Sequence, residues 1–271
     1  MPDQYAVIGN PVAHSRSPQI HAEFARQTGQ DLTYERLLAP ANGFMEAVKA
    51  FQARGGLGLN VTLPFKAEAF GYATRLSGRA SAAQAVNTLK FEDDAVFGDN
   101  TDGTGLIGDI THNLGRDIAG RRVLLLGAGG AARGVIMPLL LQQPASLTLA
   151  NRTLAKAQAL QQTIGAGLEV STYAELAGRQ FDIVVNATSA SLTGALPQLP
   201  SGLFAGGALA YDMMYGVGET PFLAFARVEG AAPLADGLGM LVEQAAESFF
   251  IWRGLRPDTA PVLKLLRQTA V

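Results

Sequence analysis

From residue 122 onward, short apolar runs alternate with longer amphipathic stretches. The apolar runs have the length and composition of strands and lie at Val123–Leu126, Ser146–Ala150, Leu168–Ser171, Asp182–Asn186, Ala208–Asp212 and Ala232–Ala235. Helical patterns fill most of the gaps, notably at Ala131–Leu141, Leu154–Thr163 and Pro221–Val228. Near-continuous apolar strands separated by helices are typical of a parallel sheet covered on both faces. This part of the chain is therefore predicted to be a Rossmann-type, doubly wound α/β domain.

The first hundred residues predict a mixed α/β unit instead. Strand patterns occur at Tyr5–Gly9 and at Gly58–Thr62, and the second of these is stopped by a proline. Val86–Phe91 is expected to pair with Ala95–Gly98 as a hairpin, because three acidic residues separate two strand-like runs.

Two helices are expected in the same unit. Ser17 is interpreted as an N-cap, since Pro18 follows it at the position where helices favour proline. Phe44, Val48 and Phe51 recur at helical spacing and mark a second, amphipathic helix.

The length of 271 residues favours two domains, because single domains are usually about 100–200 residues long. We predict a first domain made of residues 1–101 together with about 239–271, where the last helices return to it. The second domain spans 102–238 and begins with a linker helix inside the connecting segment Thr101–Ile118.

Composition narrows the function classes. Apolar residues make up 48% of the chain and charged residues 16%, so a large core can form. The net charge of −2 argues against nucleic acid or an anionic membrane as the main partner. There is no cysteine, no signal-peptide pattern at the start and no apolar run long enough to span a bilayer. We expect a soluble cytoplasmic protein without a metal site.

A glycine-rich turn follows the first strand of the second domain. Residues Gly127 to Ala132 have the G-x-G-x-x-A form that opens a helix after a strand in dinucleotide-binding domains. Gly127 would make the tight turn, and Gly129 would let the backbone approach a pyrophosphate at the helix N-terminus, beside Gly130 and Ala131. The alternative is a turn without a ligand, which the strand–helix–strand context disfavours.

The end of the next strand indicates which dinucleotide is bound. An NAD enzyme usually has Asp or Glu there, to accept from the ribose 2′-hydroxyl. This chain has Asn151, Arg152 and Thr153, followed by Lys156 one turn later. Arg152 and Lys156 are suited to a 2′-phosphate, although they could be an ordinary solvated helix start. The sequence predicts NADP.

Reduction of a ketone by a nicotinamide needs a proton donor for the oxygen. Lys66 starts a helix beside apolar Phe65, where a lysine can take part in acid–base chemistry, but it could also extend to solvent. Asp102 lies where the two domains are predicted to join and could pair with Lys66, or could be a helix N-cap. His21 and His112 are expected to be surface or packing residues, which leaves His14 as a weak alternative donor.

Other polar residues in the first domain point to a small polyhydroxylated acid as substrate. Asn60, Thr62 and Asn87 offer neutral donors and acceptors at predicted strand ends. Ser15 and Ser17 lie at a helix start, which suits a carboxylate.

Several strings, spread over essentially the whole chain, resemble the shikimate dehydrogenase family. Seven of them are Ser15–Ser17, Asn60–Lys66, Ala85–Leu89, Asn100–Gly103, Gly127–Gly134, Asn151–Thr153 and Asn186–Ser189, and two more are Tyr211–Tyr215 and Asp236–Ala245. The resemblance implies reversible reduction of 3-dehydroshikimate to shikimate with NADPH, in aromatic amino-acid biosynthesis. It also implies that the first domain binds the substrate and the second binds NADP.

The resemblance further implies roles for individual residues. Lys66 and Asp102 would be the catalytic pair, with the substrate carboxylate at Ser15 and Ser17. The ring hydroxyls and ketone would be held by Asp102 and by Asn60, Thr62, Asn87, Tyr215 and Gln244. The cofactor would also contact Thr188, Met213 and Gly237.

Two residues depart from the family pattern, and the sequence is compatible with several alternative functions. Ser191 and Val217 depart from the residues usual in the family, which puts the shape of two cofactor loops in question. A quinate/shikimate dehydrogenase of broader specificity, a non-catalytic NADP-sensing protein and, less well, a folate-type dehydrogenase are alternatives. A monomer and a homodimer are both compatible with the sequence.

Overall fold

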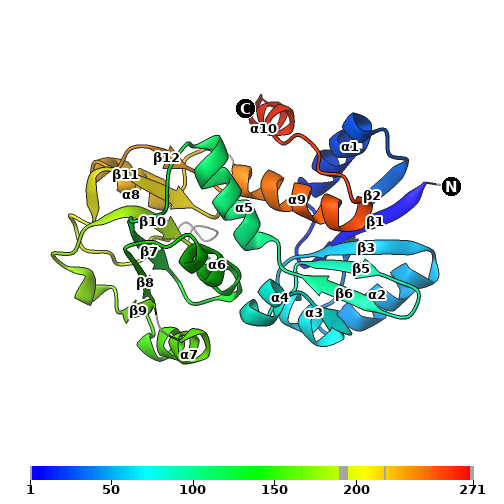
Figure 1. The fold of residues 1–271 in the computed structure, drawn as a ribbon, viewed down its shortest axis with the longest axis horizontal. Helices are drawn as coiled ribbons and strands as arrows, with labels where there is room; N and C mark the ends of the chain where they lie inside the picture. The colour runs from blue at the N-terminus through cyan, green and yellow to red at the C-terminus, as the bar shows by residue number, and fades with distance from the viewer. Residues whose placement is uncertain (1, 166, 189–194, 217, 269–271) are drawn as a thin grey trace. The chain divides into compact units, whose positions relative to one another are not determined.

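The computed structural model describes residues 2–165, 167–188, 195–216 and 218–268, so Ser191 and Val217 lie outside the described residues. The chain divides into two compact units. The first unit is Met1–Gly105 with Leu241–Leu266, and the second is Leu106–Met240 with Arg267–Val271. Each unit is considered by itself, and Figure 1 shows their elements.

The described part of the first unit is built around a six-stranded sheet with the order β2-β1-β3-β5-β6-β4. Its strands are β1 (Asp3–Gly9), β2 (Leu32–Leu38), β3 (Gly56–Val61), β4 (Arg75–Leu76), β5 (Thr88–Phe91) and β6 (Val96–Asp99). Strand β1 pairs parallel with β2 and β3, whereas β5 runs antiparallel to β3 and β6. The predicted hairpin is confirmed as β5–β6, and the sheet is mixed as expected.

Helices pack on both faces of this sheet, α2 (Phe44–Ala53) on one and α9 (Leu238–Arg253) on the other. The other described helices of the unit are α1 (Ser17–Thr28), α3 (Lys66–Tyr72), α4 (Gly78–Ala83) and most of α10 (Ala260–Gln268). Because side chains alternate along a strand, Ala6 and Ile8 of β1 join the core that contains Phe44 and Phe51 of α2. Tyr5 points to the other face, where its ring stacks on Trp252 of α9.

One local prediction for this unit was wrong, and one strand was missed. The N-cap of α1 is Arg16, and Ser17 is already the first helical residue, because Pro18 at the second helical position also suits a first turn. Strand β2 was not predicted at all. It is an edge strand with alternating burial, and Glu35 and Arg36 interrupt its apolar pattern.

The described part of the second unit contains a six-stranded sheet with the order β12-β11-β10-β7-β8-β9, in which every pairing is parallel. The strands are β7 (Arg122–Leu126), β8 (Ser146–Ala150), β9 (Leu168–Ser171), β10 (Phe181–Asn186), β11 (Phe204–Asp212) and β12 (Leu234–Ala235). With β7 numbered as strand 1 of this unit, the order read from β9 to β12 is 3-2-1-4-5-6, which is the order of the Rossmann fold. The predicted doubly wound parallel sheet is confirmed.

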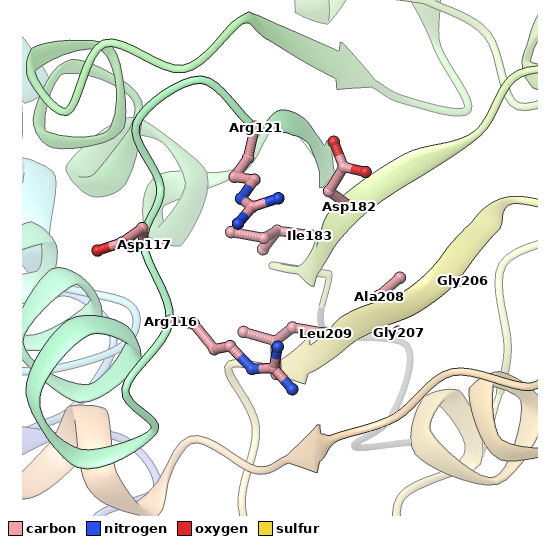
Figure 2. A pocket seen from close by; sticks show the side chains of 9 residues that line it. All are labelled: Arg116, Asp117, Arg121, Asp182, Ile183, Gly206, Gly207, Ala208 and Leu209. Atoms are coloured by element: carbon pink, nitrogen blue, oxygen red, sulfur yellow. The ribbon is translucent and has the colours of Figure 1, made fainter.

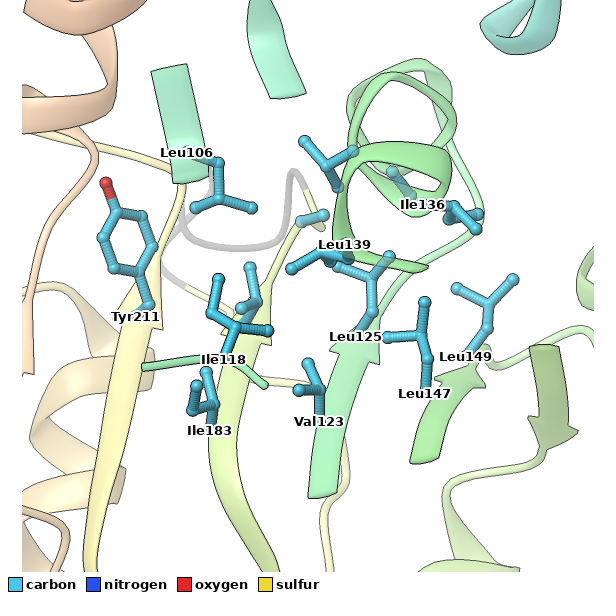
Figure 3. Packing of buried hydrophobic residues seen from close by; sticks show 14 of the residues in the cluster. Leu106, Ile118, Val123, Leu125, Ile136, Leu139, Leu147, Leu149, Ile183 and Tyr211 are labelled. Atoms are coloured by element: carbon cyan, nitrogen blue, oxygen red, sulfur yellow. The ribbon is translucent and has the colours of Figure 1, made fainter. Parts of the chain in front are cut away.

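Helices α6 (Gly130–Leu141), α7 (Leu154–Ile164) and α8 (Pro221–Val228) connect these strands, with a short 3₁₀ turn at Ala174–Leu176. Figure 3 shows Val123 and Leu125 of β7 packed with Ile136 and Leu139 of α6, in a core whose labelled residues are all buried. A strand with apolar residues on both faces is the expected consequence of helices on both sides of the sheet.

The connecting segment carries a helix, as predicted, in the form of α5 (Asp102–Gly108) followed by a π-helical turn, Asp109–Asn113. The Asp109 side chain is buried and accepts a hydrogen bond of 2.6 Å from the phenol of Tyr211 on β11. A Cβ atom at Gly239, in the first turn of α9, would collide with the Asp109 carboxylate. Glycine at 239 therefore lets a buried carboxylate approach the N-terminus of α9, where a negative charge is favourable.

No helix within the described ranges is both long and apolar enough to cross a membrane.

Candidate active site

Lys66 and Asp102 form an ion pair in the first unit. Lys66 is the first residue of α3, and Asp102 is the first residue of α5. Lys66 Nζ lies 2.5 Å from Asp102 Oδ2, and the two side chains are 19% and 8% exposed. Phe65 is fully buried in the core and anchors the start of α3. The structure thus brings together the two residues singled out for proton transfer.

Asn87 holds the other oxygen of this carboxylate. Its Nδ2 atom donates to Asp102 Oδ1 at 2.8 Å and to Gln244 Oε1 at 3.1 Å. Its Oδ1 atom accepts from the backbone N–H of Thr101 at 2.9 Å, which fixes which end of the amide faces Asp102. Three predicted substrate and catalytic residues, Asn87, Asp102 and Gln244, therefore share one hydrogen-bonded cluster with Lys66.

Asn60, near the end of β3, extends this cluster. Its Nδ2 atom donates to Ser248 Oγ at 2.9 Å and approaches Thr88 Oγ1 at 3.3 Å. Thr88 in turn donates to Asn87 Oδ1 at 2.9 Å. On its other side, Asn60 Oδ1 accepts from the phenol of Tyr34 at 2.7 Å. Asn60 is buried, and both ends of its amide are engaged.

Ser15 and Ser17 lie together at the start of α1. Ser15 Oγ is 3.2 Å from Ser17 Oγ and also accepts from the backbone N–H of Ser17. Arg36 on β2 donates from Nη2 to the backbone oxygen of Ser15 at 2.6 Å, which places a guanidinium beside the serine pair. A positive charge next to two hydroxyl groups suits a carboxylate ligand.

Thr62 follows β3, its backbone N–H donates to the oxygen of Ile8 at 2.9 Å, and its side chain packs against Gly9. A Cβ atom at Gly9 would collide with the Thr62 side chain, so glycine there makes room for it. Tyr215, the remaining predicted substrate residue, follows β11 in the second unit, whereas the other six lie in the first.

Several residues of the first-unit cluster were missed from the sequence. They are Tyr34, Arg36, Thr88, Thr101 and Ser248. Ser248 lies one helical turn after Gln244, and Thr101 lies inside the Asn100–Gly103 string, so both had a signal in helix periodicity or in the motif. Tyr34 and Arg36 had none, because strand β2 itself was not recognised.

His21 packs against this cluster at Tyr34 and Asn60, whereas no described contact joins His14 or His112 to it. His14 and His112 are exposed, whereas His21 on α1 is completely buried. The His21 ring stacks on Tyr34 with ring centres 4.2 Å apart and planes at 7°. Burial lowers the pKa of His21 to about 3, and the neighbouring Asn60 amide opposes the shift. His21 is therefore a neutral packing residue at neutral pH.

This buried histidine predicts a loss of stability in mild acid. In the unfolded chain His21 binds its proton near pH 6.5, but in the folded protein only near pH 3. The unfolded state thus carries the extra proton between these values, and the free energy of unfolding should fall by up to about 1.4 kcal/mol per pH unit as the pH drops through this window. His21→Phe, which keeps a stacking ring, should remove this contribution.

Urea unfolding of the wild type and of the His21→Phe variant between pH 4 and 7 measures the difference. Contributions from carboxylates are common to both proteins and cancel in the comparison. Parallel curves for the two proteins would show that His21 is not the titrating group.

The glycine turn of the second unit has the geometry expected for a dinucleotide. Gly127 has a φ of +99°, and a Cβ there would press on Thr188 and Ala187. A Cβ at Gly129 or Gly130 would meet no protein atom, so the packing of the chain does not require glycine at either position. Glycine there leaves open space at the N-terminus of α6, which fits the close approach of a pyrophosphate. Ala131 follows, half-buried.

Beyond the next strand, β8, the side chains differ from those of an NAD site. Asn151 Oδ1 accepts from the N–H of Ala128 at 3.2 Å and so ties this loop to the glycine turn. Arg152, Thr153 and Lys156 are exposed, and no salt bridge involves either cation within the described residues. Two exposed cations without a carboxylate suit an additional phosphate.

The remaining predicted cofactor residues follow neighbouring strands of the same sheet. Thr188 comes after β10, and its hydroxyl donates to Asn186 Oδ1 at 2.7 Å. Met213 comes after β11, and its N–H donates to the backbone oxygen of Asn186 at 2.9 Å. A Cβ at Gly237 would collide with the Met213 carbonyl, so glycine is needed for this contact. These residues lie at the carboxyl ends of parallel strands, where ligands of such sheets bind.

A separate pocket of about 180 Å³ lies at the amino ends of β10 and β11 (Figure 2). Arg116 and Arg121 line it, together with Ile183, Leu209 and the Gly206–Gly207 backbone. It contains none of the predicted site residues.

Comparisons with known proteins agree along the chain. Residues 7–89 match the family model of the Shikimate dehydrogenase substrate binding domain, residues 109–194 that of Shikimate / quinate 5-dehydrogenase, and residues 237–267 that of the Shikimate 5'-dehydrogenase C-terminal domain. The chain is 64% identical to a Shikimate dehydrogenase (NADP(+)) of Aromatoleum aromaticum, over 98% of this chain and 97% of that protein.

Two solved structures are also similar. The structure of an Ael1 enzyme from Pseudomonas putida has a TM-score of 0.92 at 52% identity, covering 97% of this chain and 98% of that one. The structure of shikimate 5-dehydrogenase from Thermus thermophilus, in complex with NADP(H) and shikimate, has a TM-score of 0.88 at 32% identity, covering 99% of this chain and 100% of that one.

Proposed function

The chain belongs to the shikimate dehydrogenase family, and on that premise we propose that it reversibly reduces 3-dehydroshikimate to shikimate with NADPH. The observation that carries this function is the Lys66–Asp102 ion pair, held by Asn87 and Gln244, in a chain so similar to NADP-dependent members. This arrangement places a charged proton donor beside neutral side chains that can hydrogen-bond the hydroxyl groups of a ring.

We assign the substrate to the first unit. The serine pair beside Arg36 supports binding of the carboxylate, and the cluster around Asn87 supports binding of the ring hydroxyls and the ketone. Asn60, Thr62 and Gln244 complete this set, and the family resemblance also assigns Tyr215 to the substrate.

NADP is held by the second unit in this proposal. Gly127, Gly129, Gly130 and Ala131 would receive the pyrophosphate at the start of α6. The 2′-phosphate would lie at Arg152 with Asn151, Thr153 and Lys156, and the nicotinamide at Met213 and Gly237, with Thr188 as a further cofactor contact. The bound nucleotide supplies the hydride for reduction.

The residues of the chain manage the proton. Lys66 donates a proton from Nζ to the ketone oxygen as that oxygen becomes a hydroxyl, and in the reverse direction neutral Lys66 removes it. Asp102 holds Nζ in place through the ion pair. Asn87 keeps the carboxylate oriented by its bond to Oδ1.

A direct assay tests this function. Purified protein supplied with shikimate and NADP is expected to produce the NADPH absorbance band. Replacing shikimate by quinate, or NADP by NAD, is expected to slow the reaction roughly tenfold or more, because the pocket contacts would no longer match the ligand. Equal rates with quinate would indicate the broader dehydrogenase, and no turnover with any pair would favour an NADP-sensing role.

We further propose that the protein acts in the cytoplasm, as a monomer or a homodimer, in aromatic amino-acid biosynthesis. The absence of cysteine from the sequence and the supply of NADPH needed for a biosynthetic reduction support a reducing compartment.

A further inference from the structure

We propose that Tyr34 is a positioning residue of the substrate site, whose hydroxyl orients Asn60 and Ser17 for shikimate. This inference rests on the proposed function, which assigns Asn60 and Ser17 to the substrate. Tyr34 lies on edge strand β2, outside every string that indicated the function.

The Tyr34 phenol joins two parts of the site. It donates to Asn60 Oδ1 at 2.7 Å. Burial raises the pKa of this phenol well above its ordinary value, although a hydrogen bond from Ser17 opposes the shift. Since the phenol stays protonated, it remains a hydrogen-bond donor throughout the working pH range. Ser15, Ser17, Tyr34 and Asn60 thus form one continuous hydrogen-bonded path.

The orientation of the Asn60 amide places its oxygen against the Tyr34 hydroxyl. The backbone oxygen of Asn87, which can only accept, lies 3.4 Å from Asn60 Nδ2, and Ser248 Oγ lies 2.9 Å from the same atom. The nitrogen end must face these acceptors, because a reversed amide would point its oxygen at a carbonyl oxygen. The Oδ1 end then faces Tyr34, and the phenol supplies its donor.

The Tyr34 ring is fixed by neighbours that do not themselves belong to the proposed substrate site. His21 stacks on it at 4.2 Å, and Trp252 of α9 lies with its ring centre 6.3 Å away. In the sheet, Tyr34 is in register with Tyr5, and Tyr5 with Gly58. Asn60, two residues after Gly58, lies on the same face of the sheet, so the phenol reaches it diagonally across β1.

Removing the hydroxyl should therefore weaken substrate binding while leaving the chemistry intact. In Tyr34→Phe, Asn60 Oδ1 loses its donor and Ser17 loses its acceptor, but the Lys66–Asp102 pair keeps all its described contacts. The KM for shikimate is expected to rise roughly 3- to 10-fold, the effect of one hydrogen bond. The kcat and the KM for NADP should stay within about twofold of the wild-type values.

Tyr5→Phe is the matched control. Tyr5 is the register partner of Tyr34, its ring stacks on Trp252 at 4.6 Å, and its hydroxyl accepts from Arg253 Nη1 at 3.3 Å. This variant loses a hydrogen bond of a buried phenol on the same face of the same sheet, and it leaves the contacts of Asn60 and Ser17 unchanged. Its KM for shikimate should equal the wild-type value.

The experiment compares the wild type, Tyr34→Phe and Tyr5→Phe by steady-state kinetics with shikimate and NADP, and by thermal unfolding. Failure of the wild type to turn over shikimate would remove the proposed function and, with it, this inference. Active wild type with an unchanged KM in Tyr34→Phe would overturn the inference alone. An equal KM increase in both variants would also overturn it, because the effect would then be structural.

Discussion

Replacing Lys66 by methionine is expected to lower kcat by roughly 10²–10⁴-fold, the effect of losing a general acid. Methionine keeps an unbranched apolar stem, one atom shorter than that of lysine, but cannot donate a proton. The Lys66 side chain is only 19% exposed and its charge is paired with Asp102 at 2.5 Å, so no other group among its described contacts carries a transferable proton to this position. The KM for NADP should change little, because the predicted cofactor residues belong to the second unit.

Loss of the lysine also leaves the Asp102 carboxylate with Asn87 as its remaining side-chain partner among the described residues, so stability has to be measured beside activity. Lys90→Met is a suitable control, since Lys90 lies on β5 of the same unit and makes only a loose 3.8 Å contact with Glu92. A folded Lys66→Met protein with near-normal kcat would remove Lys66 from the mechanism and return attention to His14. Wild-type kcat in Lys90→Met is required for the comparison to hold.

The second unit could be predicted well because its signals are local. Its strands are apolar on both faces and end in turns, so Val123–Leu126 and Ser146–Ala150 were recognisable without any knowledge of their partners. Strand order then follows from the right-handed crossovers of parallel sheets. In the first unit, β2 was missed because it is an edge strand in which two adjacent charged residues, Glu35 and Arg36, place one charge on each face and interrupt the apolar pattern.

The predicted site residues likewise differ in whether local sequence signals or long-range contacts define them. Lys66 and Asp102 were named from their neighbours in sequence, with a pairing between them and a helix N-cap as the two alternatives for Asp102. The resemblance to a family then implied the catalytic pair. The cluster around them was harder to predict, because it is made of contacts between distant residues. Asn60 and Ser248 are 188 positions apart, and Asn60 reaches Tyr34 across a whole strand. No periodicity or motif encodes contacts of this kind, which appear only once the sheet and α9 are assembled.

Changing Arg152 to aspartate is expected to reverse the preference of the protein between NADP and NAD. The substitution removes a cation from the end of β8 and introduces the carboxylate that NAD enzymes use to accept from the ribose 2′-hydroxyl. It also sets a negative charge against the 2′-phosphate of NADP, and a like-charge contact of this kind costs several kcal/mol. The ratio of kcat/KM for NADP over NAD should therefore fall by roughly 10²–10⁴-fold.

The exposed position of Arg152 makes this effect separable from folding. No salt bridge to Arg152 exists within the described part of the chain, so its loss should leave thermal unfolding nearly unchanged. Arg116→Asp makes the same change of charge in the same unit, but at the pocket near the amino ends of the strands, away from the glycine turn (Figure 2). If both variants lower the ratio equally, long-range charge accounts for the preference. If Arg152→Asp leaves it unchanged, this arginine does not select NADP, and the 2′-phosphate must be recognised elsewhere, with Lys156 as the next residue to replace.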